Sequence, residues 1–327
     1  MAKKISFRAG LVAVIVLALI VLAVMFVSLF FGAVFISPGD LFGNEILWQI
    51  RLPRVILAAL LGLLLSVSGV ILQGTLRNPL ADPYILGISA GGAIGAALAI
   101  ALGANFVILG MSSVPVLAFA TSLFAVFVVF KLSQVAGKAS PETLILAGVA
   151  ISSFCAAVLS LIIILTGNLQ SIYFWLLGSL SAAGWSNVIT VIPYALFGLG
   201  VAYFFSKELN ALLLGEELAQ TLGVDVERTR AILVGTASLM TAAAVSVSGL
   251  IGFVGLIVPH FIRILIGPNH RFLVPISALS GMLLMVVADT IARTIMAPTE
   301  IPIGIIMALV GAPFFLYLLR RRRVEGR

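Results

Sequence analysis

Between Arg54 and Gly74 the chain reads RVILAALLGLLLSVSGVILQG, and after Arg54 no charged residue interrupts this stretch. A helix needs about 20 apolar residues to cross the ~30 Å hydrocarbon layer of a bilayer, and this stretch is long enough. Runs of the same kind recur between charged or Gly/Pro-rich breaks. The sequence therefore predicts an all-α, polytopic membrane protein with about ten transmembrane helices, near residues 9–34, 54–74, 84–104, 113–133, 142–166, 187–205, 229–248, 250–266, 273–296 and 303–319.

The composition of the chain agrees with this prediction. Of 327 residues, 62% are hydrophobic and 9% are charged, whereas a soluble domain is about 45–50% apolar and about 25% charged. The loops between the ten ranges are too short for a soluble domain, so we expect one transmembrane domain over residues 1–327. The first run is longer than the apolar core of a signal peptide, and we interpret it as a retained span. The single cysteine, Cys155, excludes an intrachain disulfide.

Positive charge falls mainly on one side of the predicted membrane. With ten alternating spans both termini share a side, and 16 of the 19 Lys and Arg residues lie there, including Lys3, Lys4 and the run Arg320–Arg323. Because cytoplasmic loops are enriched in Lys and Arg, both termini are predicted to be cytoplasmic. The net charge of +7 is therefore a signal of topology. The lipid bilayer is an expected partner, and nucleic acid is not.

The sequence lacks the residues for bond chemistry and for a metal site of its own. No G-x-x-x-x-G-K-[ST] phosphate loop occurs, and His260, His270 and Cys155 are too few to form a soft metal site. We therefore predict no catalytic residue, no metal and no cofactor in this chain. No Asp or Glu falls clearly at mid-span, which weakens a proton- or sodium-coupled carrier. It does not exclude one, because backbone carbonyls at broken helices can hold sodium.

The other three basic residues, Arg51, Arg54 and Arg293, lie on the predicted outer side. Asp289 precedes Arg293 by four residues, so the two share a helix face and could pair. Phosphate headgroups would explain arginines at the interface. We favour docking of an acidic partner protein, because these three residues make up the whole basic set of this side. Replacing Arg51 or Arg54 with Glu should therefore weaken the affinity for that partner without harm to folding.

The longest polar stretch of the cytoplasmic side lies between the sixth and seventh predicted spans. Within it, residues 213–224 have the pattern of a short amphipathic helix. Leu214, Leu218 and Leu222 share one face of that helix, and Gly223 is suited to end it. An apolar ridge outside the membrane can lie in a groove of a partner protein, which is the interpretation we favour, or against the bilayer.

Several motifs follow one another along nearly the whole chain. They are R-L-P-R at 51–54, Q-G-x-x-R-N-P-L-A-D-P at 73–83 followed by L-G-I-S-A-G-G-A, L-A-G-V-A at 146–150, G-E-E-L-A-x-x-L-G-V at 215–224, S-G-x-I-G-F-V-G-L-I-V-P-H at 248–260, P-I-G at 302–304 and G-A-P-F-F at 311–315. Each motif alone is weak, but the ordered set is specific. It resembles the permease subunits of the iron-siderophore, haem and cobalamin importers, the FecCD-type family of ABC transporters.

The resemblance implies an assembly in the inner (cytoplasmic) membrane of a prokaryote. Two copies of the chain would enclose a path. Two ABC ATPase subunits, which bind the ATP and Mg, would dock on the cytoplasmic side, and one extracytoplasmic substrate-binding protein would dock on the outer side. The chain itself would be a transport subunit and not an enzyme.

The resemblance also implies roles for particular residues. Arg51, Arg54 and Arg293 would meet acidic residues of the binding protein. One cytoplasmic segment would be the coupling helix that enters the ATPase groove: Gly215, Glu216, Glu217, Leu218, Ala219, Leu222 and Gly223. Two loops would narrow the path as a cytoplasmic gate: Asn78 and Leu80, and Ser140 and Pro141.

ATP-driven import of a metal chelate is therefore the predicted function, and iron-siderophore, haem and cobalamin all remain candidate substrates. An ATP-independent secondary carrier or channel is the main alternative. Uptake that follows a proton or sodium gradient and ignores ATP would favour it. A membrane scaffold without a transport role is a third reading, and its deletion should give no ligand-dependent phenotype.

Overall fold

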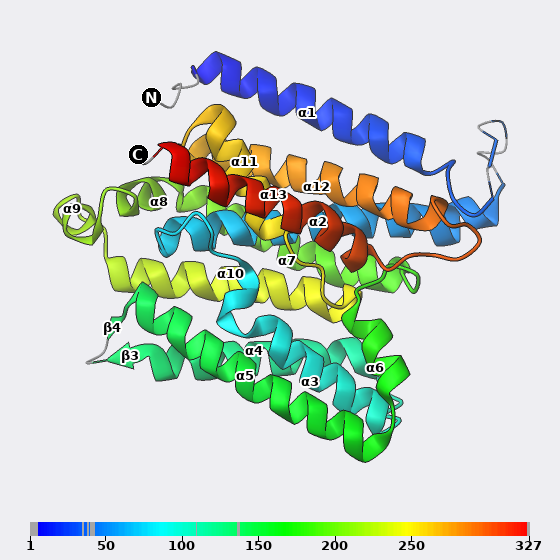
Figure 1. Cartoon of the computed structure of the whole chain (residues 1–327). Coiled ribbons are helices and arrows are strands. Elements are labelled where there is room, and N and C mark those ends of the chain that lie inside the picture. The colour runs from blue at the N-terminus through cyan, green and yellow to red at the C-terminus, as the bar shows by residue number, and fades with distance from the viewer. Residues whose placement is uncertain are drawn as a thin grey trace.

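The computed structural model of the chain describes residues 6–34, 36–37, 39, 43–108, 110–135 and 138–325, so Lys3, Lys4 and Arg327 of the topology prediction lie outside the described residues. Long helices run roughly parallel to one another (Figure 1). In chain order the helices are α1 (Phe7–Ser28), η2 (Ile46–Arg51), α2 (Leu52–Thr75), η3 (Pro83–Leu86), α3 (Ile88–Ala101), α4 (Ser113–Ser133), α5 (Pro141–Thr166), α6 (Leu169–Leu176), α7 (Trp185–Phe204), α8 (Ser206–Leu212), α9 (Glu216–Thr221), α10 (Val226–Ser248), α11 (Val254–Ile266), α12 (His270–Thr294) and α13 (Ile303–Glu325).

Two short antiparallel hairpins, which the all-α prediction missed, complete the described secondary structure. In the first, β1 (Val107–Ile108) pairs with β2 (Met111–Ser112), so that Val107 lies opposite Ser112. In the second, β3 (Gln134–Val135) pairs with β4 (Lys138–Ala139), and Gln134 lies opposite Ala139. Each strand has two residues, so the hairpins are connections between helices and add no sheet to the fold.

Each of the ten predicted ranges overlaps at least one helix, and the range 84–104 overlaps both η3 and α3, but the helices differ in length. Among the described residues, seven helices are long and apolar enough to cross a membrane: α1, η2 with α2, α4, α5, α7, α10 and α12. The apolar helices α3, α11 and the Ile303–Leu316 part of α13 are shorter. A mostly helical chain with several helices long and apolar enough to cross a membrane is therefore confirmed, while the count of ten spans and the cytoplasmic termini stay predictions.

Two of the short helices, α3 and α11, begin later than their predicted spans, because a stretch that is not α-helical comes first: η3 with Gly87 before α3, and residues 249–253 before α11. Tyr84 in η3 connects these stretches, because its hydroxyl donates to the carbonyl of Ile251 (3.0 Å) and accepts from the amide of Ile251 (2.8 Å). Nearby, the amide of Ser179 donates to the carbonyl of Ser248 (2.8 Å). Irregular backbone is tolerated inside a membrane protein where its polar groups find partners within the protein. The partners account for the late starts of α3 and α11.

Helix α2 forms the centre of the bundle, and it packs against α7, α10, α11 and α12. Its side chains are buried almost from end to end, with Leu57, Leu61 and Leu64 fully inaccessible. Two glycines of α2 allow close crossings, since Gly62 faces Gly281 of α12 and Gly69 faces Gly255 of α11. Small residues at such crossings let helix backbones approach closely, which is a main source of packing inside a membrane.

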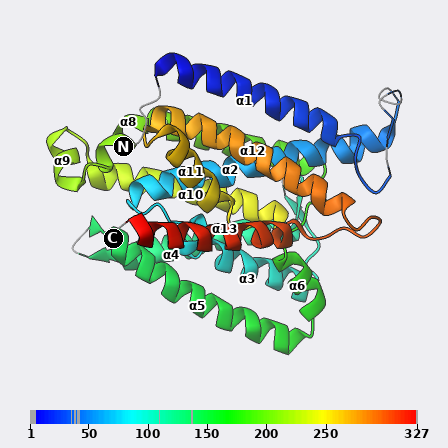
Figure 2. The ribbon, with the colours of Figure 1, turned by 45° about the horizontal axis from the view of Figure 1, so that its top comes forward.

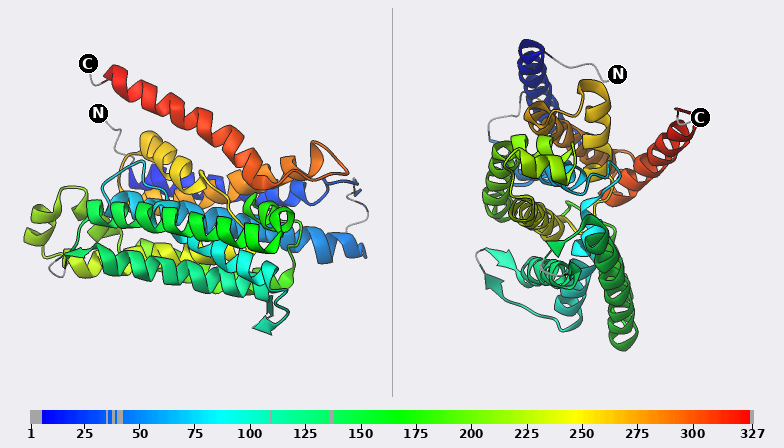
Figure 3. Two further views of the ribbon diagram at one scale, coloured as in Figure 1. Left: turned by 60° about the horizontal axis from the view of Figure 1, so that its bottom comes forward. Right: turned by 90° about the vertical axis from the view of Figure 1, so that its left-hand side faces the viewer.

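The two ends of the bundle carry different elements. The start of α1, the end of α13, α9 and the β3–β4 hairpin lie at one end, and the start of η2 and α2 lies at the other (Figures 1 and 2). This places the predicted cytoplasmic segments together and the predicted outer arginines opposite them. Viewed along the bundle, α5 and α13 diverge from each other on the same side of the molecule (Figure 3, right).

Candidate functional site

The structure brings the three predicted outer arginines together at one end of the bundle. Arg51 ends η2, Arg54 lies in the first turn of α2, and Arg293 lies in the last turn of α12. None of them is an exposed surface residue, because their exposed fractions are 6%, 7% and 3%. The expectation that Arg51 and Arg54 tolerate Glu without harm to folding does not fit this burial, because a carboxylate would then replace a buried cation. Their docking role stays a prediction.

Two carboxylates hold Arg54 and Arg293. Arg54 donates through Nε to Asp289 (3.0 Å to Oδ1), and its Nη1 contacts Glu300 (2.8 Å to Oε1). Asp289 also faces Arg293, 3.4 Å from its Nε to Oδ2, as the four-residue spacing predicted. Asp289 is 1% exposed, so its charge depends on these two cations. We call the five residues Arg51, Arg54, Arg293, Asp289 and Glu300 the outer charge cluster.

Arg51 differs from its neighbours, because its guanidinium is held by backbone carbonyls. Its guanidinium donates to the carbonyls of Leu29 (2.9 Å) and Val34. Leu29 is the C-terminal cap of α1, where carbonyl groups are left without helical partners and a cation is favoured. Arg51 thus ties the end of α1 to the start of α2.

A pocket of about 360 Å³ opens onto this cluster. Its lining includes Asn44, Arg51, Arg54, Arg293 and Glu300. The three arginines outnumber the two carboxylates of the cluster, so the pocket carries an excess of positive charge. An acidic side chain that entered it could reach guanidinium groups that are not accessible from the open surface.

Asp289→Asn should destabilise the chain by about 3–5 kcal/mol, because it leaves Arg54 and Arg293 buried without their shared carboxylate. Thermal unfolding of the detergent-purified protein measures the loss. Glu300→Gln is the matched control: its side chain is 35% exposed, and a loss of about 1 kcal/mol or less is expected there. Equal stability of the Asp289 variant and the wild type would show that the cluster contributes nothing to folding.

At the opposite end, helix α9 is shorter than predicted. It covers Glu216–Thr221 rather than residues 213–224, because Gly215 has φ +114°, a conformation that a helix cannot include. The predicted end is confirmed. Gly223 has φ +84°, and the amides of Gly223 and Val224 donate to the carbonyls of Gln220 and Ala219, which is the Schellman arrangement.

The two faces of α9 differ in their exposure to solvent. Ala219 is fully buried, in a small cluster with Ala211, Leu212 and Val226. By contrast, the leucine ridge (Leu214, Leu218 and Leu222) is exposed by 61%, 56% and 65%. Glu216 and Glu217 occupy the first turn, where negative charge is favoured. The segment therefore presents apolar side chains at the end of the bundle where the predicted cytoplasmic elements gather.

The two predicted gate loops are separate turns. In the first, Asn78 Oδ1 accepts from the amide of Leu80 (3.0 Å). In the second, Ser140 caps α5 by accepting from the amide of Thr143 (3.2 Å), and Pro141 is the first residue of that helix. All four predicted gate residues are half-buried. The segments that follow these loops meet where Ile85 packs closely against Gly148. Among the described residues, no hydrogen bond or ion pair joins the two loops themselves.

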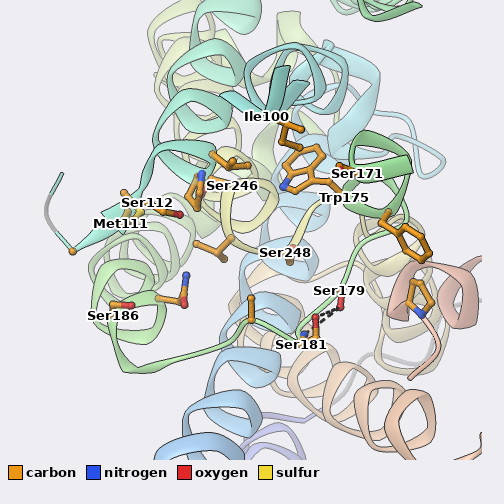
Figure 4. Close-up of a pocket in the computed structure, with 18 of the residues that line it drawn as sticks. Ile100, Met111, Ser112, Ser171, Trp175, Ser179, Ser181, Ser186, Ser246 and Ser248 are labelled. Atoms are coloured by element: carbon orange, nitrogen blue, oxygen red, sulfur yellow. Dashed lines mark hydrogen bonds between the residues drawn. The ribbon is translucent and has the colours of Figure 1, made fainter. Parts of the chain in front are cut away.

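A second outer pocket, of about 730 Å³, was not predicted from the sequence. Its lining combines apolar side chains, among them Trp175, with several serine hydroxyls (Figure 4). The labelled serines come from separate parts of the chain: Ser112, Ser171, Ser179, Ser181, Ser186, Ser246 and Ser248. Because no short motif unites them, their spacing carried no signal. Hydroxyls both donate and accept hydrogen bonds, so the pocket suits a polar ligand surface.

Within the described residues, no group of three His, Cys, Asp or Glu side chains is arranged to hold a metal ion. His270 is fully buried, and its Nδ1 lies 2.9 Å from Asn210 Oδ1, which ties the start of α12 to α8. This histidine has a structural partner.

Comparison with known proteins places this architecture in a family. The sequence profile of the FecCD transport family matches residues 17–321. The cobalamin import system permease protein BtuC of Halobacterium salinarum is 48% identical over 282 residues, which cover 86% of this chain and 75% of that protein. The hemin transport system permease protein HmuU of Yersinia pestis is 41% identical over 308 residues, covering 90% of this chain and 91% of that protein.

A solved structure shares the fold. A metal-chelate type ABC transporter in an inward-facing conformation matches with a TM-score of 0.85 and 33% identity, covering 94% of this chain and 98% of that one. The relatives are ABC importer permeases, which are membrane transport subunits and not enzymes. The family match spans nearly the whole chain, including its motifs and its long helices. The chain therefore belongs to the FecCD transport family.

Proposed function

We propose that this chain is the transmembrane subunit of an ATP-driven importer that moves a metal chelate into the cytoplasm of a prokaryote. The observation that carries the proposal is the family match over residues 17–321. Relatives at 48% and 41% identity are permeases for cobalamin and hemin, which supports a bulky metal chelate as the class of substrate. In this proposal ten helices cross the inner membrane and both termini are cytoplasmic.

The leucine ridge is the proposed contact with the ATPase subunits. Leu214, Leu218 and Leu222 are each more than half exposed, at an end of the bundle that would lie outside the hydrocarbon layer. Apolar ridges of this kind are buried in grooves of partner proteins. The proposed coupling helix comprises α9 and its flanks, Gly215 to Gly223. ATP and Mg would be bound by two such partner subunits, one for each copy of the chain.

A second copy of the chain is proposed to face the divergent helices α5 and α13. Helix α5 buries only Leu144, Gly148 and Cys155 within the described part of its own chain. Its exposed residues mix large apolar side chains such as Phe154 and Leu161 with the hydroxyls of Ser153 and Ser160. Both hydroxyls donate to a carbonyl one turn earlier on α5 and keep acceptor capacity, so they can line a polar path between two copies. The chelate would travel along that path as a whole.

The outer charge cluster is the proposed docking site for the extracytoplasmic binding protein. Because the arginines are buried, we propose that an acidic side chain of the partner enters the 360 Å³ pocket rather than meeting an exposed patch. Desolvated charge pairs of this kind contribute more to affinity than pairs on an open surface.

Arg51→Gln should weaken binding of the substrate-binding protein by more than about tenfold, because loss of a desolvated charge pair costs about 2–5 kcal/mol. Surface plasmon resonance with the reconstituted transporter measures the affinity. Gln49→Glu is the matched control, since it shifts the net charge of the same exposed end by the same amount outside the pocket. Equal losses in both variants would show that only the general charge of the outer face matters.

The proposed function is tested by gentle purification of the chain from its native membrane, followed by reconstitution. A co-purifying subunit with a phosphate loop, near one per copy, and chelate uptake that requires ATP would support the importer. A chain that reproducibly purifies alone, and that transports in response to a proton or sodium gradient, would overturn it in favour of a secondary carrier. A pure chain with no uptake under either condition would favour a scaffold.

A further inference from the structure

Arg230, in the second turn of α10, is a buried cation. Its side chain contacts two segments that are separate in the sequence, one before α5 and one at the start of α9. Its side chain is 2% exposed, although it lies at the end of the bundle that carries α9 and the β3–β4 hairpin. By sequence alone it is one of many basic residues on the predicted cytoplasmic side. A buried guanidinium requires partners, because its charge would otherwise be left without water or a counter-ion. The identity of those partners shows what this residue connects.

One set of contacts consists of hydrogen bonds to the backbone immediately before α5. Arg230 Nη1 donates to the carbonyl of Ala139 (2.9 Å), and the amide of Ala139 donates to Glu227 Oε2 (3.3 Å). Arg230 Nη1 also contacts Glu227 Oε1 at 2.9 Å, three residues earlier on α10. Ala139 is itself 1% exposed. The Arg230–Glu227 pair therefore holds both polar backbone groups of Ala139, and the next two residues are the predicted gate residues Ser140 and Pro141.

The other partner is Glu216, the first residue of α9. Arg230 Nη2 forms an ion pair with Glu216 Oε1, so a single guanidinium joins the start of α9 to the start of α5. The same oxygen lies 3.9 Å from Nη2 of Arg77, which directly precedes the predicted gate residue Asn78. Arg77 is 44% exposed, so this second link is the weaker one.

We propose that Arg230 is a positioning residue that couples displacement of α9 to the cytoplasmic start of α5, and through Glu216 to the turn that contains Asn78. The proposal rests on the proposed function, because it takes α9 as the helix that the ATPase subunits move. Movement of Glu216 away from Arg230 would leave a buried cation partly unpaired. Arg230 and the backbone of Ala139 must then follow α9, or the contact must break. As long as the contact holds, a displacement of α9 is passed on to the segment that begins α5.

The chemistry of arginine suits this task. Its two Nη atoms point to different elements, one to Ala139 and Glu227 and the other to Glu216. A lysine ammonium is a single point charge and cannot reproduce this fork, so Arg230→Lys should restore charge without restoring coupling. A residue that merely filled space or balanced charge would be replaced by Lys without consequence.

The test uses the complete transporter in proteoliposomes and measures chelate uptake and ATP hydrolysis in the same vesicles. We expect Arg230→Gln to assemble and hydrolyse ATP, and to lower the chelate imported per ATP at least tenfold. Arg230→Lys should fall by a similar factor. Arg228→Gln is the matched control, because Arg228 is two residues away on α10 and exposed, and its uptake per ATP should stay within twofold of the wild type.

Hydrogen exchange of the same variants provides a readout within the chain. Arg230→Gln should speed exchange in residues 138–144 and in residues 216–222. Glu216→Gln should affect mainly the second segment, because the hydrogen bonds of Arg230 and Glu227 to Ala139 stay intact in that variant. If Arg230→Gln fails to assemble, Glu216→Gln carries the test. A drop in uptake per ATP in that variant supports the link, and unchanged uptake per ATP overturns it.

The failure of this proposal differs from the failure of the proposed function. If the wild-type complex imports chelate with ATP but Arg230→Gln behaves like Arg228→Gln, the coupling role of Arg230 is wrong and the importer stands. If the wild type shows no ATP-driven uptake at all, the proposed function is wrong, and with it the coupling role. Faster exchange in both segments together with unchanged uptake per ATP would show a structural anchor only, which also overturns the proposal.

Discussion

Leu218→Asp should reduce ATP-driven uptake by the reconstituted transporter by more than about tenfold. Leu218 lies in the middle of α9, is 56% exposed, and belongs to the leucine ridge. Burying one leucine in a groove contributes about 1.5–3 kcal/mol, and a carboxylate in the same groove adds a desolvation penalty. Each 1.4 kcal/mol corresponds to about a tenfold change in affinity. The fold should be unaffected, because exposed substitutions change stability by about 0.5 kcal/mol or less.

Uptake, ATP hydrolysis and recovery of the ATPase subunit should be measured on one preparation of this variant. Gln220→Asp is the matched control, since it places the same carboxylate on the same short helix, exposed but away from the ridge. We expect the control to transport at nearly the wild-type rate. If the Leu218 variant assembled and transported as well as the control, α9 would not be the coupling helix.

The helices could be predicted from sequence because hydropathy and length report directly on crossing a bilayer, and each predicted range overlaps a helix. The errors occur where backbone conformation overrides composition. Residues 249–253 are apolar enough to continue a span, yet they leave the helix at Gly249 and bind Tyr84, which is distant in the sequence. Residues 213–215 are likewise compatible with a helix, but the conformation of Gly215 delays its start to Glu216.

In the candidate sites, contacts between residues close in the sequence could be predicted, and contacts between distant residues could not. The pairing of Asp289 with Arg293 followed from helical spacing, and the structure confirms it. The contact of Arg54 with Glu300 joins residues 246 positions apart, and no single-sequence pattern could indicate it. The burial of the arginines was unpredictable for the same reason. Each sits at a predicted interface, where composition alone makes an exposed side chain the natural expectation.

Gly69→Val should prevent the chain from reaching its native packing. A Cβ atom on Gly69 would lie 1.8 Å from the carbonyl oxygen of Gly255, and the obstacle is backbone, which cannot rotate out of the way as a side chain can. Overpacking inside a well-packed core costs about 1–3 kcal/mol even where neighbours can move. Here α2 would have to separate from α11 at the centre of the bundle. The penalty should therefore exceed that range and approach the whole stability of a domain, about 5–15 kcal/mol.

Fluorescence-detected size-exclusion chromatography of the detergent extract measures this effect, and little monodisperse Gly69→Val protein is expected. Gly235→Val is the matched control: Gly235 lies within α10, and a Cβ there would meet nothing within 4 Å. Both variants carry the same β-branched residue in a helix, so the small loss of helix propensity is shared. A lower yield of Gly69→Val than of Gly235→Val would therefore be caused by the clash where α2 crosses α11. Equal yield and melting temperature would mean that the two helices can separate at this point without loss, and that α2 does not hold the bundle together there.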